Sequence, residues 1–272
     1  MTKSSKDIPS IDNSFIRRGA HFFRRIPLKL VDLLSYERYK EQHQKKFLQT
    51  VLDNIMEMPS FSERIDLILS LKEEDSRLLA RKVTADGEKA LPGFSKFIEK
   101  GWSKAMITRY ALAAYYCKDK IVLDSCCGLG WGSYLVEAKA EKVIALELNR
   151  EAIELALELF PFERTLLVQG SVLDLALRDS SVDVALAMES IEHFNFDDIK
   201  RYLDELHRVL KPGGVLVGSS AFPKRREDVS AHVLNNPYHL HICTRDEIKS
   251  LLKSRFRRHR IYYNHRYITA WK

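Results

Sequence analysis

Short apolar runs alternate with helical stretches from residue 121 to residue 272, and this alternation restricts the fold more than any other feature of the sequence. The runs are IVLDSC, KVIALEL, TLLVQGSV, VDVALAM and GGVLVGSS. Continuous apolar strands separated by helices are typical of a parallel sheet that is covered on both faces, because neither face then meets water. Residues 121–272 are therefore expected to form an α/β domain.

The connections between these runs have the lengths that such a domain needs. The clearest connecting helices are predicted at Arg150–Phe160 and Asp197–Leu210, and the second ends at Lys211–Gly214, which we interpret as a helix terminator and turn. A further helix over about Thr244–Lys253 precedes two last strand-like runs, RRHRIYYNH and RYITAWK. With 272 residues, of which 45% are hydrophobic, the chain is long enough for this core and a smaller appended region.

The sequence before residue 121 has a different pattern. Between about Pro27 and Lys82, apolar residues recur at three- and four-residue intervals, which is typical of helices, and no strand pattern occurs. Residues 85–101 are rich in turn formers, and Ser103 then opens a helix. The expected parts are an N-terminal helical extension over residues 1–84, a connecting segment with a lead-in helix over residues 85–120, and the α/β domain over residues 121–272.

Hydropathy and cysteine usage bear on the compartment. No apolar run approaches the roughly 18 residues that a membrane-spanning helix needs, and the first residues, MTKSSKDIPSIDNSF, carry no apolar signal core. The four cysteines form no C-x-x-C pair, and Cys126 and Cys127 are adjacent, a spacing that strains a disulfide. We therefore expect reduced thiols, a cytoplasmic location and no transmembrane segment.

The formal net charge of +7 is unevenly distributed. Basic residues gather in Arg17–Lys46, and residues 249–272 contain no acidic residue. Basic surface favours anionic partners such as RNA, and the arginines and tyrosines of residues 255–266 partly fit that role. Apolar side chains among the N-terminal arginines also suggest peripheral membrane contact through the N-terminal helices; packing of those helices on the α/β domain is the alternative.

A glycine-rich turn, DSCCGLGWG, follows the first predicted strand and opens a helix. Glycines here let the backbone approach a ligand closely and adopt positive φ. The second strand ends in Glu147, about twenty residues further on, where a carboxylate can accept both hydroxyl protons of a ribose. A nicotinamide site would need G-x-G-x-x-G, but Ser133 occupies the place of the third glycine.

The ordered motifs VLDSCCGLGWGSYLV, VIALELNREAI, VQGSVLDLAL, VDVALAMESIEHF and LHRVLKPGGVLV resemble those of class I S-adenosylmethionine-dependent methyltransferases. The resemblance covers roughly residues 121–272. It implies a Rossmann-like, seven-stranded, mostly parallel sheet whose antiparallel strand is RYITAWK, and S-adenosyl-L-methionine as the cofactor. The cofactor-binding residues that it implies are Asp124, Ser125, Cys126, Gly128, Gly130, Glu147, Leu148, Ser171, Val172 and Met188.

By this resemblance, Asp124 and the glycine turn hold the methionine end of the cofactor, Glu147 holds the ribose, and Ser171 and Val172 flank the adenine. Two positions depart from the family pattern. Cys126 replaces the first glycine, so we expect this position to avoid positive φ. Ser171 stands where an acidic residue commonly meets the adenine amino group, so that contact is weaker or moves to Asp174.

The segment GEKALPG at Gly87–Gly93, followed by Arg109-Tyr110, resembles the G-E-R-x-x-P-G and R-Y elements of a bacterial subgroup of these enzymes. In that subgroup, this resemblance implies a lid over the cofactor. Lys89 replaces the arginine of the motif here. Residues 85–120 are accordingly predicted to form a lid and lead-in helix, with an ordinary linker as the alternative.

The segment after the fourth strand, Met188–Phe194, contains the pattern E-x-x-E-H. Methylation of a hydroxyl benefits from a base with a pKa near neutrality, so His193 is the candidate base, with Glu192 and Glu189 as further catalytic candidates. The alternative is that the pair Glu192 and His193 only caps a helix or shapes the cofactor pocket.

The same segment also suggests a metal site. Glu189, Glu192 and His193, together with His239 of NPYHLH, provide ligands for a divalent cation such as Mg²⁺. Similar arrangements occur in ubiquinone-pathway O-methyltransferases and in small-RNA 2′-O-methyltransferases. The alternative is that NPYHLH forms a wall of the acceptor pocket.

The function expected from these motifs is S-adenosylmethionine-dependent O-methylation of a small molecule or a glycan intermediate. Two alternatives remain open. An RNA methyltransferase would fit the basic charge, and a non-catalytic module that binds S-adenosylmethionine would fit the cofactor motifs alone.

Overall fold

The computed structural model describes residues 46, 49–51, 53, 55, 58–72, 75, 91–99, 101–228, 236–262 and 266–272. The chain divides into two compact units, residues 1–47 and residues 48–272. Of the first unit, only Lys46 is described, so the helices expected to contact a membrane lie outside the described residues. The three-part division of the chain stays a prediction. Within the described ranges, no helix has both the length and the hydropathy to cross a bilayer.

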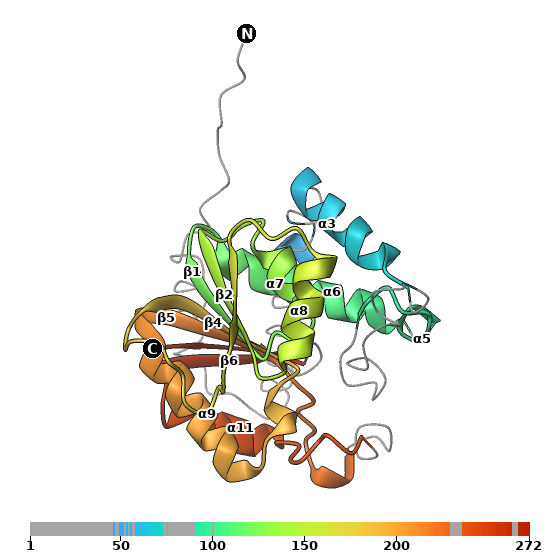
Figure 1. Ribbon diagram of the computed structural model, residues 1–272. Coiled ribbons are helices and arrows are strands. Elements are labelled where there is room, and N and C mark those ends of the chain that lie inside the picture. Colours follow the sequence, from blue (N-terminus) through green and yellow to red (C-terminus); the bar gives the residue numbers. More distant parts are fainter. Residues whose placement is uncertain are drawn as a thin grey trace. The chain divides into compact units, whose positions relative to one another are not determined.

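A single seven-stranded sheet forms the centre of the second unit, in the order β3-β2-β1-β4-β5-β7-β6 (Figure 1). Strands β1 to β5 run parallel, β7 runs antiparallel to β5, and β6 runs antiparallel to β7. The strands are β1 Ile121–Ser125, β2 Lys142–Glu147, β3 Thr165–Gln169, β4 Val182–Met188, β5 Leu210–Ser219, β6 Arg258–Tyr262 and β7 Tyr267–Trp271. The predicted Rossmann-like, mostly parallel sheet is confirmed, including the antiparallel strand at RYITAWK.

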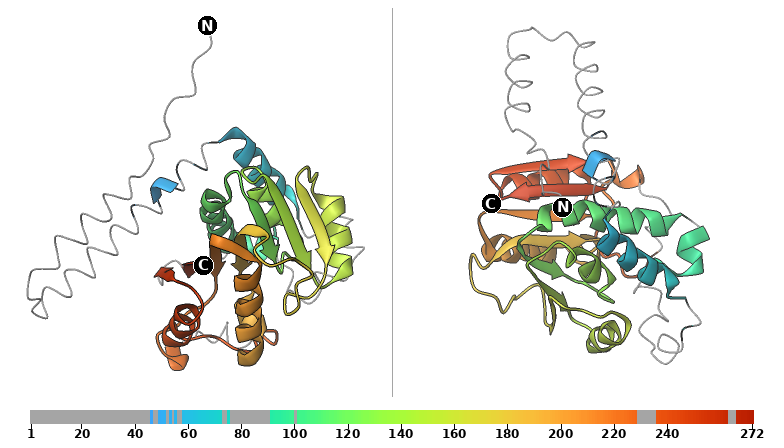
Figure 2. Two further views of the ribbon diagram at one scale, coloured as in Figure 1. Left: turned by 90° about the vertical axis from the view of Figure 1, so that its left-hand side faces the viewer. Right: turned by 90° about the horizontal axis from the view of Figure 1, so that it is seen from above.

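Helices cover both faces of this sheet (Figure 1 and Figure 2). The helices α6, α7 and α8 lie on one face, and α9 and α11 lie on the other. The helices are α3 Pro59–Ser70, α5 Ser95–Glu99, α6 Trp102–Cys117, α7 Trp131–Val136, α8 Arg150–Leu159, α9 Phe196–Val209 and α11 Arg245–Lys253, with short 3-10 helices η3 Ile191–His193 and η4 Arg226–Asp228. The three helices predicted within the α/β domain are thus confirmed as α8, α9 and α11.

Polar caps fix where these three helices begin. Asn149 accepts a hydrogen bond from the Ala152 amide at the start of α8, and Asn195 caps α9 in the same way. Thr244 and Glu247 form a capping box at the start of α11. Each cap satisfies amide groups that the first helical turn leaves without an intrahelical partner, so the sequence marks these starts locally.

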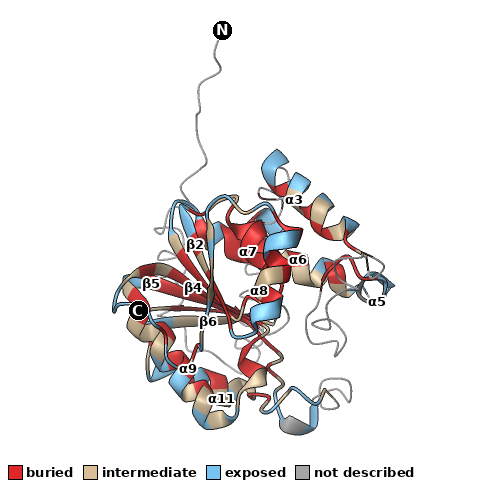
Figure 3. Ribbon diagram, in the orientation of Figure 1, coloured by how far each residue is buried: buried red, intermediate tan, exposed pale blue. Residues whose placement is uncertain are grey.

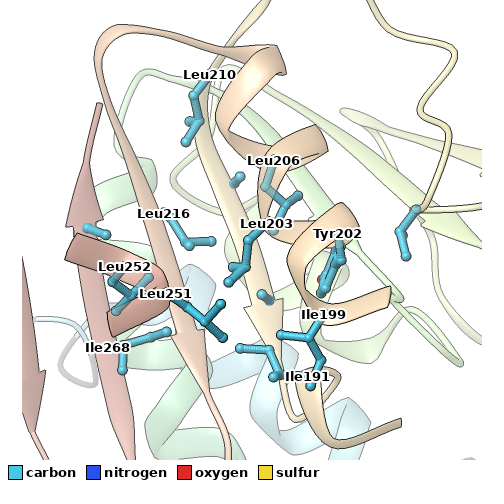
Figure 4. Packing of buried hydrophobic residues seen from close by; sticks show 14 of the residues in the cluster. Ile191, Ile199, Tyr202, Leu203, Leu206, Leu210, Leu216, Leu251, Leu252 and Ile268 are labelled. Carbon is cyan, nitrogen blue, oxygen red and sulfur yellow. The ribbon is translucent and has the colours of Figure 1, made fainter. Parts of the chain in front are cut away.

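The core between the sheet and the α9–α11 layer is apolar and fully enclosed (Figure 3 and Figure 4). Alternate strand residues point into it, because successive side chains of a strand face opposite sides. Spacings of three and four residues place the apolar stripe of α9 on the same core. Its buried members include Leu123, Leu216 and Ile268 from the strands, Ile199, Tyr202, Leu203 and Leu206 from α9, and Leu251 and Leu252 from α11.

The predicted turn at Lys211–Gly214 is part of β5 rather than a separate turn. Leu210 pairs with Val182 of β4 and Val215 pairs with Val184, so β5 carries extra residues between these pairs and forms a bulge. Gly213 adopts φ 81° there, and its amide donates to the Lys272 carbonyl at 3.2 Å. The prediction that the helix ends here was correct, but the bonds to the C-terminal residue keep the segment within the sheet.

A buried carboxylate ties α3 to the α/β domain. Glu137, which follows α7, is 1% exposed and accepts from Arg64 of α3 at 2.9 Å. It also accepts from the amides of Glu163 and Arg164, at 3.2 and 3.1 Å, and from the Thr165 hydroxyl. One side chain therefore connects α3, the end of α7 and the start of β3.

We expect the substitution Glu137→Leu to lower the free energy of unfolding by about 3 kcal/mol, because it leaves a guanidinium and two amides without their partner. The control is Glu154→Leu, which removes an exposed ion pair between Glu154 and Arg150 and should cost less than about 1 kcal/mol. Urea denaturation followed by circular dichroism measures both values. Equal losses in the two variants would contradict this account of Glu137.

Candidate functional site

A cavity of about 560 Å³ lies at the carboxyl ends of the parallel strands. Its walls come from the segments that follow β1, β2, β3 and β4, from one face of α6, and from residues 237–240. Ligands of open α/β sheets bind at this edge, because the strand order reverses there and leaves a crevice between β1 and β4. The cavity is of the size that small-molecule sites occupy.

The turn after β1 has three left-handed residues, Cys126, Gly128 and Gly130, with φ of 60°, 58° and 72°. The expectation that Cys126 would avoid positive φ is therefore wrong. The amide of Cys127 donates to the Leu146 carbonyl of β2 at 2.9 Å, which bends the chain immediately after Cys126. A side chain in this conformation costs roughly 1–2 kcal/mol, so the surrounding bonds must hold it.

Glu147, at the end of β2, supports this turn from the side. Its Oε2 accepts from the Gly128 amide at 2.9 Å and its Oε1 accepts from the Asn149 amide at 3.0 Å. The side chain is 5% exposed and lines the cavity. The carboxylate predicted to hold a ribose thus lies beside the glycine turn.

Asp124 lies beneath the turn and is fully buried. It accepts from the Ser133 hydroxyl at 2.6 Å and from the Tyr110 hydroxyl of α6 at 3.4 Å. Burial raises the pKa of this carboxyl to about 7, while the bonds from Ser133 and Tyr110 lower it. At Gly132, a Cβ would lie 2.1 Å from the Tyr110 ring, so the glycine is what lets α6 pack this closely.

The predicted cofactor residues divide into two groups by position. Asp124, Ser125 and Gly130 do not line the cavity: Asp124 and Ser125 lie at the end of β1, and Gly130 is part of the turn itself. Ser171 lines the cavity, but its hydroxyl accepts from the Leu173 amide at 3.2 Å, and Asp174 does not reach the cavity wall. The predicted cofactor residues that do line the cavity are Cys126, Gly128, Glu147, Leu148, Ser171, Val172 and Met188.

Glu189 follows β4 in a left-handed conformation, φ 48°, and lines the cavity. Its amide donates to the Ser219 carbonyl of β5 at 2.8 Å. Its carboxylate lies between two guanidiniums, 3.4 Å from Arg109 and 3.7 Å from Arg266. Both arginines are distant in sequence, so the E-x-x-E-H pattern alone did not reveal these ion pairs.

His193 also lines the cavity, and its ring is held in one tautomer. Nδ1 lies 3.2 Å from the Tyr238 carbonyl, which only accepts, so Nδ1 carries the hydrogen. Nε2 is then the basic nitrogen. The His239 ring stacks edge-on at 5.2 Å between centroids. The structure therefore brings the E-x-x-E-H and NPYHLH segments together at one wall of the cavity.

Glu192 does not line the cavity. It is 3% exposed, and its carbonyl accepts from the amides of Leu240 and His241 at 2.9 and 3.3 Å. Burial first, and then the charge of Glu189, raise the pKa of its carboxyl to about 8. The backbone of Glu192 thus joins the loop after β4, which carries His193, to the NPYHLH segment.

The predicted cation site is not supported by this geometry. Glu189 pairs with arginines, Glu192 is buried behind the wall, and the His239 ring nitrogen lies 3.0 Å from the Asn236 amide group. Among the residues that the structure describes, no group of three or more His, Cys, Asp or Glu side chains is placed to hold a metal ion.

Only the end of the predicted lid, Leu91–Gly93, is described; residues 87–90 lie outside the described residues. Leu91 is buried, and the Ser103 hydroxyl donates to the Pro92 carbonyl at 2.5 Å. The lid itself stays a prediction. In the helix that follows, α6, Arg109 and Tyr110 line the cavity.

Several residues of the site were missed by sequence reasoning. Met106, Trp131 and Phe194 line the cavity, and no separate role was predicted for any of them. A buried hydroxyl chain through Tyr202 was also missed, because this tyrosine occupies one position of an apolar helical stripe and gives no separate signal.

Comparison with known proteins identifies similar sequences and folds. The pattern of a family described as a methyltransferase domain matches residues 123–218. A probable S-adenosylmethionine-dependent methyltransferase of Mycolicibacterium smegmatis is 30% identical over 172 residues, which cover 62% of this chain and 63% of that protein. A fatty-acid O-methyltransferase of the same organism is 30% identical over 127 residues, which cover 43% and 46%. The chain thus spans less than two thirds of the length of either relative.

A similar fold occurs in a solved S-adenosylmethionine-dependent methyltransferase from Thermotoga maritima. The TM-score is 0.50 at 16% identity, and the match covers 65% of this chain and 97% of the other. At this identity the likeness concerns the fold alone.

The raised pKa of Asp124 predicts how stability varies with pH. Between about pH 4 and pH 7 the folded state holds a proton that the unfolded state has released, so the free energy of unfolding falls as pH rises through this window. The contribution of this one group is at most about 1.4 kcal/mol per pH unit. Asp124→Asn should remove it, as measured by urea denaturation at several pH values, whereas Asp66→Asn, at an exposed position of α3, should not. An unchanged slope in the Asp124 variant would refute the assignment.

Proposed function

The chain belongs to the class I S-adenosylmethionine-dependent methyltransferases, and we propose that it transfers a methyl group from S-adenosyl-L-methionine to a hydroxyl oxygen of a small-molecule or glycan acceptor. The observation that carries the proposal is the 3.2 Å contact between Nδ1 of His193, a residue of the cavity wall, and the Tyr238 carbonyl, from which we infer that Nε2 is the basic nitrogen. We propose further that the protein acts in the cytoplasm, because the sequence has no C-x-x-C pair and the adjacent Cys126 and Cys127 are poorly spaced for a disulfide.

The cavity has the features that the cofactor needs. Glu147 offers carboxylate oxygens to the ribose hydroxyls, and Leu148 and Val172 offer apolar surface to the adenine. At the left-handed Gly128 the backbone lines the cavity, so a ligand can approach it without meeting a side chain. When bound, S-adenosyl-L-methionine supplies an electrophilic methyl group.

His193 acts in this proposal as the general base. Its Nε2 accepts the proton of the acceptor hydroxyl as the oxygen attacks, while Nδ1–H stays bonded to the Tyr238 carbonyl. That carbonyl also stabilises the imidazolium that forms, because its dipole points toward the ring. Glu189, held between Arg109 and Arg266, keeps a fixed negative charge on the same side of the cavity.

The acceptor enters, in this proposal, past an apolar rim. Tyr238 and Leu240 line the cavity and are 39% and 63% exposed, and Phe194 and Pro237 continue the same wall. Exposed apolar groups at a cavity mouth favour a ligand with an apolar part. The name of the fatty-acid O-methyltransferase relative agrees with an acceptor of this kind.

The geometry does not favour the RNA alternative. Arg255 pairs with Asp204 at 2.7 Å, and Arg258 and Arg260 lie over the Trp271 ring at 4.5 and 5.8 Å. These arginines are thus engaged within the chain, and none of them lines the cavity. The non-catalytic alternative differs from the proposal only in turnover, so it is tested by assay.

Cofactor binding is the first test. Titration calorimetry should show binding of S-adenosylhomocysteine to the wild type and a loss of affinity of at least about tenfold in Glu147→Ala, because two hydrogen bonds to a carboxylate are removed. Glu151→Ala, at an exposed position of α8, should bind as the wild type does. Absence of binding by the wild type would overturn the proposed cofactor and with it the proposed function.

The second test concerns His193. With tritium-labelled S-adenosyl-L-methionine and a panel of phenols, hydroxy fatty acids and sugars, His193→Ala should lower kcat by about 10²- to 10⁴-fold and leave cofactor affinity unchanged. The control His259→Ala changes a histidine of the edge strand β6 and should keep full activity. Full activity in His193→Ala would exclude the proposed base. Binding of cofactor without turnover of any acceptor would favour the non-catalytic alternative.

A further inference from the structure

The geometry points to Tyr202 of α9 as a positioning residue that holds two segments in one fixed arrangement. One is the loop after β4, residues 189–194, which carries the proposed base His193 and is called the base loop here. The other is the turn after β1, residues 126–130, which is called the cofactor turn. Tyr202 is fully buried, and its side chain lies on the face of α9 that packs against the sheet (Figure 4). This inference rests on the proposed function, because it concerns the same base and the same cofactor site.

The Tyr202 hydroxyl lies between two serines that belong to different parts of the site. It is 2.5 Å from Ser125 Oγ, at the end of β1, and 3.1 Å from Ser190 Oγ, in the loop after β4. Ser125 Oγ in turn donates to the Leu186 carbonyl of β4 at 2.5 Å. Three hydroxyls thus form a continuous chain between the cofactor turn and the base loop.

The chemistry of the partners fixes which group donates in every hydrogen bond of this hydroxyl chain. The Leu186 carbonyl only accepts, so the single proton of Ser125 is used there. Tyr202 must then donate to Ser125, and Ser190 must donate to Tyr202. Burial raises the pKa of the Tyr202 hydroxyl well above its ordinary range, which keeps this donor protonated. Removing the middle hydroxyl therefore leaves both serines without this partner.

Each end of the hydroxyl chain adjoins a residue with a strained backbone conformation. Ser125 precedes Cys126, and Ser190 follows Glu189; both neighbours are non-glycine residues with positive φ, at 60° and 48°. Such conformations persist only where the surrounding structure holds them. The hydroxyl chain is placed to do this at both positions, one in the cofactor turn and one at the start of the base loop.

The ring of Tyr202 contacts the far end of the base loop. It packs on Phe194, with 5.1 Å between ring centroids. The Ser190 carbonyl accepts from the His193 amide at 3.1 Å. The hydroxyl and the ring of Tyr202 therefore hold the residues on both sides of η3, and His193 lies between them. The orientation that lets His193 Nδ1 donate to the Tyr238 carbonyl depends on this support.

The test compares Tyr202→Phe with Tyr267→Phe in the full chain. Tyr267 is a matched control, because it is 1% exposed and its hydroxyl has no hydrogen-bond partner among the described residues. The readout is the tautomer of His193, measured by nitrogen-15 magnetic resonance of histidine-labelled protein and assigned with His193→Gln. A general loss of stability does not change a histidine tautomer in protein that stays folded.

We expect His193 to carry its proton on Nδ1 in the wild type and in Tyr267→Phe, and to become a mixture of tautomers in Tyr202→Phe. Affinity for S-adenosylhomocysteine should fall about tenfold in Tyr202→Phe and stay unchanged in Tyr267→Phe. The same His193 signal in both tyrosine variants would overturn the inference.

Ser190→Ala gives a second variant in case Tyr202→Phe does not fold. It removes the link to the base loop and keeps the bond between Tyr202 and Ser125, so the His193 tautomer should change. An unchanged His193 signal in Ser190→Ala also overturns the inference. Neither readout needs an acceptor, so a failure of the proposed methyl transfer is seen separately, as binding without turnover.

Discussion

Two carboxylates on neighbouring strands hold the turn between β1 and α7, and the rest of the site depends on this pair. Asp124 supports the turn from beneath through Ser133, and Glu147 supports it from the side through the Gly128 amide. A turn held at two points can keep Cys126 left-handed, which a flexible loop would not. The same buried Asp124 also receives the Tyr110 hydroxyl of α6, so the helix that lines the cavity is positioned by the group that supports the turn.

The fold was predictable because each strand carries its own signal. A sheet covered on both faces requires continuous apolar runs, and those runs, with the caps at Asn149, Asn195 and Thr244, are local in sequence. The bulge in β5 was not predictable in this way. It depends on bonds between Gly213 or Gly214 and Lys272, the last residue of the chain, and a local pattern of proline and glycine indicates only a turn.

The sequence motifs predicted which residues belong to the candidate site better than they predicted the conformations and contacts of those residues. The motifs identified Glu147, Glu189 and His193 as neighbours of one cavity, because parallel strands bring their carboxyl ends together. The conformation of Cys126 was wrongly expected, since the family pattern gives a residue type and not the bonds of the neighbouring strand. The metal hypothesis depended on free carboxylates, and the arginines that pair with Glu189 come from α6 and from the residue before β7, outside the motif.

In the proposed reaction, the tautomer of His193 connects the choice of acceptor with the chemistry. The Tyr238 carbonyl fixes the hydrogen on Nδ1, and the Tyr238 side chain is part of the apolar rim that an acceptor would contact. An acceptor that packs well on this rim keeps the carbonyl in place and leaves Nε2 basic. One that displaces the segment removes the bond to Nδ1 and lets the ring protonate on the other nitrogen. Under this proposal, binding energy at the rim is converted into a correctly oriented base, which is one way that contacts remote from the reacting atoms contribute to rate.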